Sequence, residues 1–220
     1  MMFILAVCSA LLTAGAALEC EVCLAINSNT CSGHYERCKS PQSHCMVTRT
    51  EKSFKDDNGG QRRSAVIEKS CGSLHSCSHP ATLTTEKFHV RVTTVCCSND
   101  FCNNGTINWQ QPNSTDNGLS CPSCFARNSP TCDVETHVNC TGDENHCVQY
   151  SATHGEYTIT VAGCASESMA RSNGGAAFRG SSVTVYGMQN RNNGGGSVRH
   201  DASLLSLLAM LTILSGYSRI

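Results

Sequence analysis

The spacing of the cysteines constrains this chain most, because two similar series follow one another along it. The first five intervals are 3, 8, 7, 7 and 26 residues in the first series and 3, 8, 8, 7 and 17 in the second. Only the fifth differs by more than one residue, and a loop can shorten there without disturbing a framework of bridges. A tandem repeat is therefore predicted. The first series comprises Cys20, Cys23, Cys31, Cys38, Cys45, Cys71, Cys77, Cys96, Cys97 and Cys102, and the second comprises Cys121, Cys124, Cys132, Cys140, Cys147 and Cys164.

The number of cysteines indicates a secreted protein. Seventeen cysteines in 220 residues are typical of a disulfide scaffold, and such bridges persist only in an oxidising compartment. One of them, Cys8, lies in the apolar stretch 3–12, which small residues follow up to Ala17. This is the pattern of a signal peptide, predicted here over residues 1–17. Its removal leaves sixteen cysteines, an even number that can pair completely.

Charge and composition exclude some partners. The formal net charge is -1 and only 15% of residues are charged, so nucleic acid and anionic membrane surfaces are poor partners. Aromatic residues make up 5% of the chain, which predicts thin cores in which cross-links substitute for buried area. Two copies of such a module favour protein binding over catalysis.

Local periodicity predicts strands. The interval 45–71 contains Asn58-Gly59, a preferred pair for a tight hairpin turn because both residues tolerate positive φ. Apolar and polar side chains alternate over 88–93, and again over 157–161 after a turn near His154 and Gly155. No stretch of ten or more residues in the two repeats has helical periodicity. The predicted fold is all-β, with short hairpins that project from a knot of disulfides.

The cysteine pattern carries a resemblance to a known family. The spacing C-x2-C-x7-C-x6-C-x6-C, a later pair, and the sequence C-C-x4-C-N at 96–103 resemble the three-finger domain of the lymphocyte-antigen-6 / urokinase-receptor family. More narrowly, 117–124, 140–147 and 163–169 resemble the two-domain group that includes the gamma-type phospholipase A2 inhibitors and their mammalian relatives. The resemblance covers residues 18 to about 170. It implies two tandem three-finger (LU) domains.

The resemblance also implies the disulfide pairing, which spacing alone does not select. In the first copy it pairs Cys20 with Cys45, Cys23 with Cys31, Cys38 with Cys71, Cys77 with Cys96 and Cys97 with Cys102. In the second copy it pairs Cys121 with Cys147, Cys124 with Cys132 and Cys140 with Cys164.

The second copy lacks counterparts of the last four cysteines of the first. Ala170 stands where a counterpart of Cys77 is expected, and residues 184–187 are nearest to Thr-Val-Cys-Cys. Loss in whole pairs leaves no unpaired thiol, but it removes the constraint of two bridges. The composition of 168–196 is rich in Gly, Asn and Ser, so we expect this third finger to be loose or a stalk. A segment from a variant transcript, without selected structure, is the alternative.

The tail after the second copy has the composition of a glycosylphosphatidylinositol signal. Small residues at 193–196 and a polar spacer precede the apolar run 204–214, and Asn193 is the predicted attachment residue. The apolar run is too short to span about 30 Å of hydrocarbon as a helix, so a retained membrane helix is the weaker interpretation. A soluble secreted protein is the other alternative.

These features divide the chain into six predicted segments. They are a signal peptide (1–17), the first three-finger module (18–103), a glycosylated linker (104–118), the second, degenerate module (119–187), a stalk with the anchor-attachment region (188–203) and a hydrophobic signal that is removed (204–220). Three sequons predict N-glycosylation at Asn104, Asn113 and Asn139, two of them in the linker.

Motifs that suggest chemistry have simpler explanations. The C-x2-C pairs have redox or zinc spacing, but each cysteine has a framework partner and an oxidised bridge cannot ligate zinc. His44 and His146 precede equivalent cysteines, which indicates a packing position. The other histidines have no nucleophile and acid spaced for a triad, and no His-Asp pair of a secreted phospholipase occurs in either module. We expect no catalytic residue, no metal ligand and no cofactor.

Two features suggest a protein partner. The only tryptophan, Trp109, lies in the linker and is either an interface anchor or a cover for the junction of the modules. Basic residues of the second finger offer steering of an acidic partner, but neighbouring acidic residues offset four of them, which favours a solvated hairpin. The basic residues are Arg49, Lys52, Lys55, Arg62, Arg63 and Lys69, and the acidic ones are Glu51, Asp56, Asp57 and Glu68.

The sequence supports two hypotheses of function. The first is an extracellular binding protein, with secreted phospholipase A2 as the partner that the resemblance suggests and steric occlusion as the mechanism. The second is a lipid-anchored surface receptor, adhesion or barrier protein with no inhibitory activity. No small-molecule substrate is expected in either case.

Overall fold

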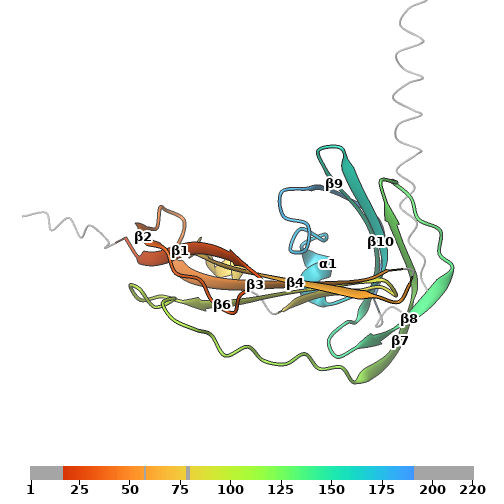
Figure 1. The fold of residues 1–220 in the computed structure, drawn as a ribbon, viewed down its shortest axis with the longest axis horizontal. Coiled ribbons are helices and arrows are strands. Elements are labelled where there is room, and N and C mark those ends of the chain that lie inside the picture. The colour runs from red at the N-terminus through yellow and green to blue at the C-terminus, as the bar shows by residue number, and fades with distance from the viewer. Residues whose placement is uncertain (1–16, 57, 78–79, 191–220) are drawn as a thin grey trace, which may run out of the picture.

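Eleven strands form one connected sheet in a computed structural model that describes residues 17–56, 58–77 and 80–190 (Figure 1). The strand order is β11-β9-β10-β5-β6-β3-β4-β1-β2, and β7 joins β10 and β8 beside this path. The predicted signal peptide, the attachment residue Asn193 and the C-terminal signal lie outside the described residues. Within them, no helix has the length and apolar character needed to cross a membrane.

The first module contains three antiparallel hairpins. Its central strand β3 pairs with β4 along its whole length and with β6 on the other side. The strand β1 pairs first with β2 and then with β4, and β5 pairs with β6. The elements are β1 (Glu19–Ile26), β2 (His34–Arg37), β3 (His44–Lys55), β4 (Gln61–Gly72), the 3-10 turn η1 (Leu74–Ser76), β5 (Ala81–Thr84) and β6 (Phe88–Cys97).

The second module repeats the first two hairpins and then departs. Its third finger is a short helix and a single strand, β11, which pairs with β9 as β6 pairs with β3. Strand structure extends beyond the predicted bounds of this module, 119–187, since β7 begins within the predicted linker and β11 ends after residue 187. The elements are β7 (Asp116–Arg127), β8 (Thr136–Thr141), β9 (His146–His154), β10 (Tyr157–Ala165), α1 (Glu167–Arg171) and β11 (Ser182–Asn190).

The predicted long hairpin of the first module and the shorter one of the second are both present, and their turns follow from the sequence. In β3–β4 the Asp56 Oδ1 accepts from the backbone N–H groups of Asn58 and Gly60 at 3.1 and 2.6 Å, and Gly59 has φ +80°. The turn is therefore wider than the two-residue turn that Asn58-Gly59 predicts, because the Asp56 carboxylate organises it. In β9–β10 the chain reverses at Gly155, with φ +60°.

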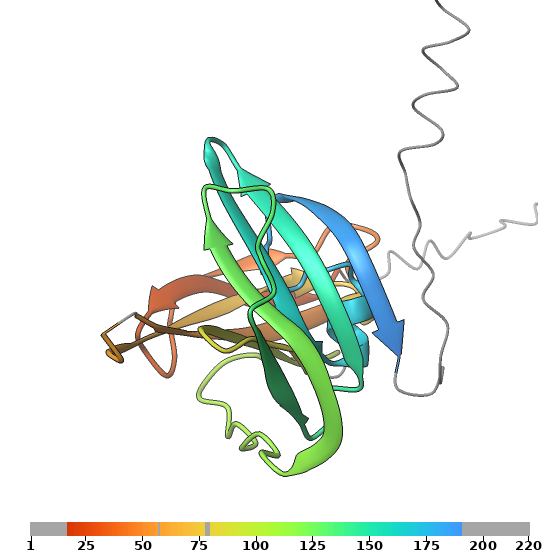
Figure 2. The same cartoon turned by 90° about the vertical axis from the view of Figure 1, so that its right-hand side faces the viewer.

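The largest hydrophobic core lies between the two modules. The end of β10 pairs with β5, where Cys164 faces Thr84 and Ala165 faces Leu83. One face of β5 and β6 packs against the second module, and the Phe88 ring lies 6.4 Å from that of Phe178. The two modules thus meet edge to edge, and the strands of the second run at a steep angle to those of the first (Figures 1 and 2). The buried core residues are Ala81, Leu83, Phe88, Val90, Val92, Val148, Tyr150, Ala152, Val161, Ala165, Met169, Ala177 and Phe178.

Eight disulfides join the sixteen cysteines from 20 to 164, in the pairs that the family resemblance implies. Five lie in the first module and three in the second. The prediction of an all-β fold with two disulfide-rich modules, the second with fewer bridges, is confirmed.

The expectation of a loose third finger in the second module is wrong for its described part, 168–190. The helix α1 begins at Ser166, whose Oγ accepts from the N–H of Met169, and Met169 is fully buried. Phe178 is 8% exposed, and β11 then pairs with β9 over its whole length. Apolar burial against the first module therefore takes the place of the two missing bridges. Composition concealed this because the buried residues are few and widely spaced.

Candidate functional site

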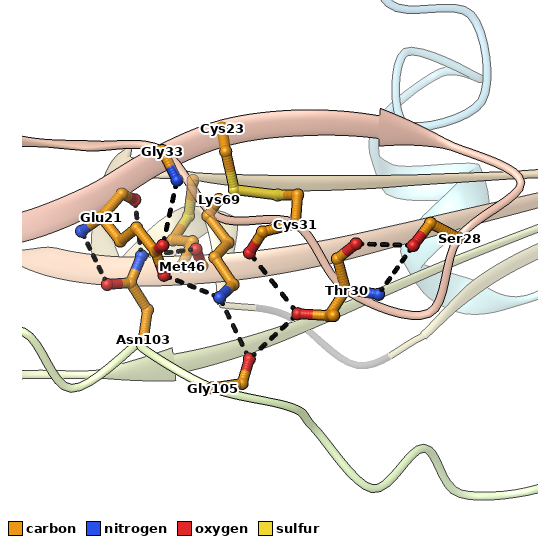
Figure 3. A network of polar contacts seen from close by, with 10 residues as sticks. All are labelled: Glu21, Cys23, Ser28, Thr30, Cys31, Gly33, Met46, Lys69, Asn103 and Gly105. Atoms are coloured by element: carbon orange, nitrogen blue, oxygen red, sulfur yellow. Dashed lines mark hydrogen bonds and ion pairs between the residues drawn. A yellow bond between two sulfur atoms is a disulfide. The ribbon is translucent and has the colours of Figure 1, made fainter.

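A buried ion pair joins β1 and β4 of the first module. Lys69 Nζ donates to Glu21 Oε2 at 2.7 Å, and the two side chains are 1% and 4% exposed (Figure 3). Burial alone would raise the pKa of Glu21, but hydrogen bonds from Lys69 and from the N–H of Gly33 outweigh it and lower that pKa. Lys69 Nζ also donates to the Gly105 carbonyl at 3.0 Å. This contact fixes the start of the linker on the first module.

Asn103, the last residue of the C-C-x4-C-N pattern, reinforces this anchor. It is 1% exposed, and its Oδ1 accepts from the N–H of Glu21 at 2.9 Å. Its Nδ2 donates to the carbonyls of Glu21 and Met46 at 2.9 and 3.2 Å. The side chain thus joins β1 and β3 to the point where the linker leaves (Figure 3).

Beyond this anchor the linker crosses one face of the first module. Ile107 and Trp109 pack against the buried cluster of Cys31, Val47 and Ile67. We call residues 106–112 the strap. Among the described residues none forms a hydrogen bond with the strap, so its contact with the sheet consists of packing and one cation–π contact between Arg49 and Trp109.

A groove of about 760 Å³ opens between the strap and the polar face of β3, β4 and β6. Its ionisable lining consists of four cationic side chains, one carboxylate and one histidine, which gives it a positive net charge although the whole chain has a net charge of -1. A second hollow of about 380 Å³ shares Arg91, Trp109 and Gln110 with it. The ionisable lining residues are Arg49, Lys52, Arg63, Arg91, Glu51 and His89.

One end of the groove is closed by contacts to the second module. The Thr84 hydroxyl donates to Glu144 Oε1 at 2.5 Å and lies 2.8 Å from His89 Nδ1. Because this hydroxyl has a single proton, His89 Nδ1 is the donor in the second contact. Burial lowers the pKa of His89, and the carboxylates of Glu144 and Glu51 offset only part of that shift. His89 is therefore neutral at pH 7.

The structure divides the predicted basic residues of the second finger. Lys69 is buried in the ion pair with Glu21, and Lys55 and Arg62 are exposed without lining the groove. The other three, Arg49, Lys52 and Arg63, line the groove. Arg49 Nη2 lies 2.8 Å from Glu51 Oε1, and its guanidinium group lies 5.8 Å from the centroid of the Trp109 ring.

Trp109 covers the first module rather than the junction of the modules. Its ring is half-buried on that module's satellite core, and it lines both hollows. Asn104, Asn113 and Asn139, the predicted glycosylation residues, are all exposed. Two of these sequons flank the strap on either side, so glycans placed there would border the groove.

The remaining sequence candidates have structural roles. His44 and His146 stand at equivalent register positions, opposite Gly72 and Ala165, but only His146 is buried. There are two groups of three cysteines, and within each group the three sulfur atoms lie within 4.8 Å of one another. Every sulfur in them belongs to a disulfide, and an oxidised sulfur does not ligate a metal.

Sequence reasoning missed Arg91, Thr84 and Glu144. The alternation of β6 places Arg91 on the polar face, which suggests exposure. The strap and the second module cover that face, and neither contact has a local signature in the sequence. Arg91 is only 7% exposed.

Comparisons with known proteins place the chain beside a domain family and several relatives. A model of the u-PAR/Ly-6 domain matches residues 16–105 and 117–191. A gamma-type phospholipase A2 inhibitor of Gloydius brevicaudus siniticus is 28% identical over 169 residues, which cover 72% of this chain and 78% of that protein. The phospholipase A2 inhibitor NAI of Notechis ater is 28% identical over 165 residues, with the same shares of both chains. The crystal structure of mouse TEX101 matches 78% of this chain and 99% of that chain at 16% identity, with a TM-score of 0.34.

Proposed function

Since the chain belongs to the u-PAR/Ly-6 domain family, we propose that it is an extracellular binding protein that inhibits a secreted phospholipase A2 by steric occlusion. Two relatives that span most of its length are named phospholipase A2 inhibitors, which supports this enzyme class as the partner. The proposal includes no catalytic step by the chain itself.

The groove under the strap is the observation that carries this proposal. It combines cationic side chains with an aromatic ring, and such surfaces bind proteins well. Its floor consists of paired strands on a disulfide-bonded module, so the partner meets a preorganised surface and little entropy is lost on binding. When the partner docks there with its active-site face toward the groove, this chain covers that active site and blocks the access of substrate.

A binding and activity assay tests the proposal. The full chain, purified from eukaryotic cells, is titrated against a panel of secreted phospholipases A2 while their hydrolysis of mixed micelles is followed. We expect binding at micromolar concentration or below and a matching loss of hydrolysis for at least one enzyme. Absence of binding at micromolar concentration across the panel would refute the inhibitor assignment.

We further propose a second candidate, a lipid-anchored surface receptor, adhesion or barrier protein. The apolar run 204–214 after small and polar residues favours it, with Asn193 as the attachment residue. Phosphatidylinositol-specific phospholipase C should release the protein from cells. A protein that stays on the membrane after this treatment, while a known anchored protein is released, contradicts the anchor.

We also propose N-glycosylation at Asn104, Asn113 and Asn139, because each begins a sequon and is exposed. Digestion with peptide N-glycosidase F should lower the apparent mass in three steps when the enzyme is limiting. Replacement of each asparagine by Gln should remove one step each.

A further inference from the structure

Arg91 is a buried cation without a counter-ion. It is 7% exposed, and the structure records no carboxylate within ion-pair distance among the described residues. Its one hydrogen bond runs from Nε to Thr93 Oγ1 at 3.3 Å, while its Nη1 is shielded from solvent and has no partner in the described part of the chain. Glu51 stands opposite Arg91 in the register of β3 and β6, but its carboxylate forms its ion pair with Arg49. Buried charges in proteins are normally paired, so a further anion would complete the pairing of Arg91.

A second arginine, Arg49, lies on the same face of the sheet; it is half-buried and paired with Glu51, but it too has a donor without a partner. Arg49 faces Thr93 in the register of β3 and β6, and Arg91 donates to that same threonine. The two guanidinium groups therefore lie near one another on one face of the sheet. Arg49 Nε is also buried and without a partner in the described chain. Glu51 neutralises one of the two charges through Arg49 Nη2, and the other remains.

A third donor completes the set. Trp109 Nε1 is likewise buried and lacks an acceptor among the described residues. All three side chains line the same groove, and all three orphan atoms are N–H donors. Such a set is complementary to an anionic acceptor and not to a cation or to an apolar group.

The strap is able to admit that acceptor. Its residues Trp109 and Gln110 line both hollows together with Arg91, and its contacts with the sheet in the described structure are apolar packing and the cation–π contact of Trp109 with Arg49. Segments held by few apolar contacts and no hydrogen bonds open locally at low free energy. A small displacement of the strap exposes the Arg49 and Arg91 donors on the sheet, while Trp109 Nε1 stays beside them on the strap itself.

We propose that Arg91 and Arg49 together bind the carboxylate of an acidic side chain of the partner protein, with Trp109 Nε1 beside them. This inference rests on the proposed function as a protein-binding protein and deepens it. The fork of a guanidinium group matches a carboxylate in a bidentate contact, and burial strengthens that contact. The acidic residue would therefore act as the anchor of the interface.

The charge distribution favours an acidic protein segment over a sulfated glycan. Glycan chains with many sulfates bind extended rows of cations, whereas the chain as a whole has a net charge of -1. The groove supplies one enclosed site next to an aromatic ring, which suits one side chain on a protein surface.

The single tryptophan provides a direct readout. Synthetic hexaglutamate is titrated into the full chain while Trp109 emission is followed, and calorimetry gives the affinity independently. We expect saturable binding and a shift in emission, with hexaglutamine giving neither. Arg91→Gln and Arg49→Gln should each weaken the affinity about tenfold or more, because each removes a charged donor to the carboxylate.

Arg62→Gln is the matched control, since it makes the same charge change on an exposed residue of β4 outside the groove. It should weaken binding less than about threefold. Equal loss in Arg62→Gln and Arg91→Gln would overturn the inference, as would no binding of hexaglutamate at millimolar concentration. Binding of a heparin-derived oligosaccharide in place of hexaglutamate would overturn it as well.

The same variants separate this inference from the proposed function. If hexaglutamate binds through Arg91 and no secreted phospholipase A2 binds, the inference holds and the inhibitor assignment fails. If a phospholipase A2 binds the wild type and Arg91→Gln equally, the inhibitor assignment holds and the inference fails. Circular dichroism of both arginine variants checks that they fold.

Discussion

The two modules share their first two hairpins, yet they are stabilised differently. The first has five bridges and the buried pair of Lys69 with Glu21. The second has three bridges, and Pro122 and Ala162 stand at the positions equivalent to that pair. Its third finger is held by apolar contacts with its neighbour. The first module is thus cross-linked internally, whereas the second depends on the first.

A cross-link that one module lacks can therefore be compensated by contacts outside that module. Two more bridges would have lowered the conformational entropy of the unfolded second module. Without them, the entropy lost on folding is offset by burial of Met169, Ala177 and Phe178 against β5 and β6. The two modules must therefore stay in contact, and the floor of the groove beside their junction is held rigid as a result.

The largest effect should come from breaking the ion pair of the first module. Lys69→Met leaves the Glu21 carboxylate buried and uncompensated, which should lower the free energy of unfolding by about 4 kcal/mol. Guanidinium chloride titration measures this. Lys55→Met, on the exposed end of the same hairpin, should change it by less than about 0.5 kcal/mol.

A double variant sharpens the result. Glu21→Leu with Lys69→Met removes both charges, so it should recover much of the loss. A cost below about 1 kcal/mol for Lys69→Met alone would show that the pair does not distinguish the modules.

The next effect should come from the third finger of the second module. Phe178→Ala removes the ring that stacks on Phe88 and should cost about 3 kcal/mol. Limited proteolysis of the native protein should then cut within 171–190 much faster than in the wild type. Tyr186→Ala, at a residue that is 51% exposed, should leave the rate unchanged. Equal rates in both variants would mean that burial does not hold this segment.

Removal of a bridge that the second module lacks should cost less. Cys97 and Cys102 close a loop with a separation of 5 residues, so their replacement by Ala should cost about 2 kcal/mol in the chain-entropy model. Thermal unfolding of the secreted double variant measures it. If the double variant fails to fold, the first module cannot do without a bridge that the second module lacks.

The smallest effect should be one of pH at the junction. Because the pKa of His89 is lower in the folded protein than its unfolded value of about 6.5, its contribution to stability is complete above that pH and is lost as pH falls through the folded pKa. Relative to His89→Asn, the wild type should lose stability between pH 7 and 5, by at most about 1.4 kcal/mol per pH unit. Denaturant titrations at pH 7, 6 and 5 test this, with His137→Asn as an exposed control. Parallel curves for wild type and His89→Asn would contradict it.

The sequence predicted features that depend on local pattern. Alternation over 88–93 and 157–161 marked strands correctly, and the cysteine repeat marked two modules. It failed where distant segments cover a face. Arg91 shares a polar stripe with the half-buried His89 and Thr93, yet it is itself buried, and strap residues line the same groove. Likewise, nothing near Phe178 in the sequence indicates that β6 of the other module receives it.

Because the sheet is joined across the two modules, the pair of modules, and not the single module, is the unit that can fold into a soluble protein. Cut away from its neighbour, the first module would present the apolar face of β5 and β6 to water, a surface that invites aggregation. A gene fragment encoding one three-finger domain of this chain would therefore yield an insoluble product, even with all five of its bridges formed.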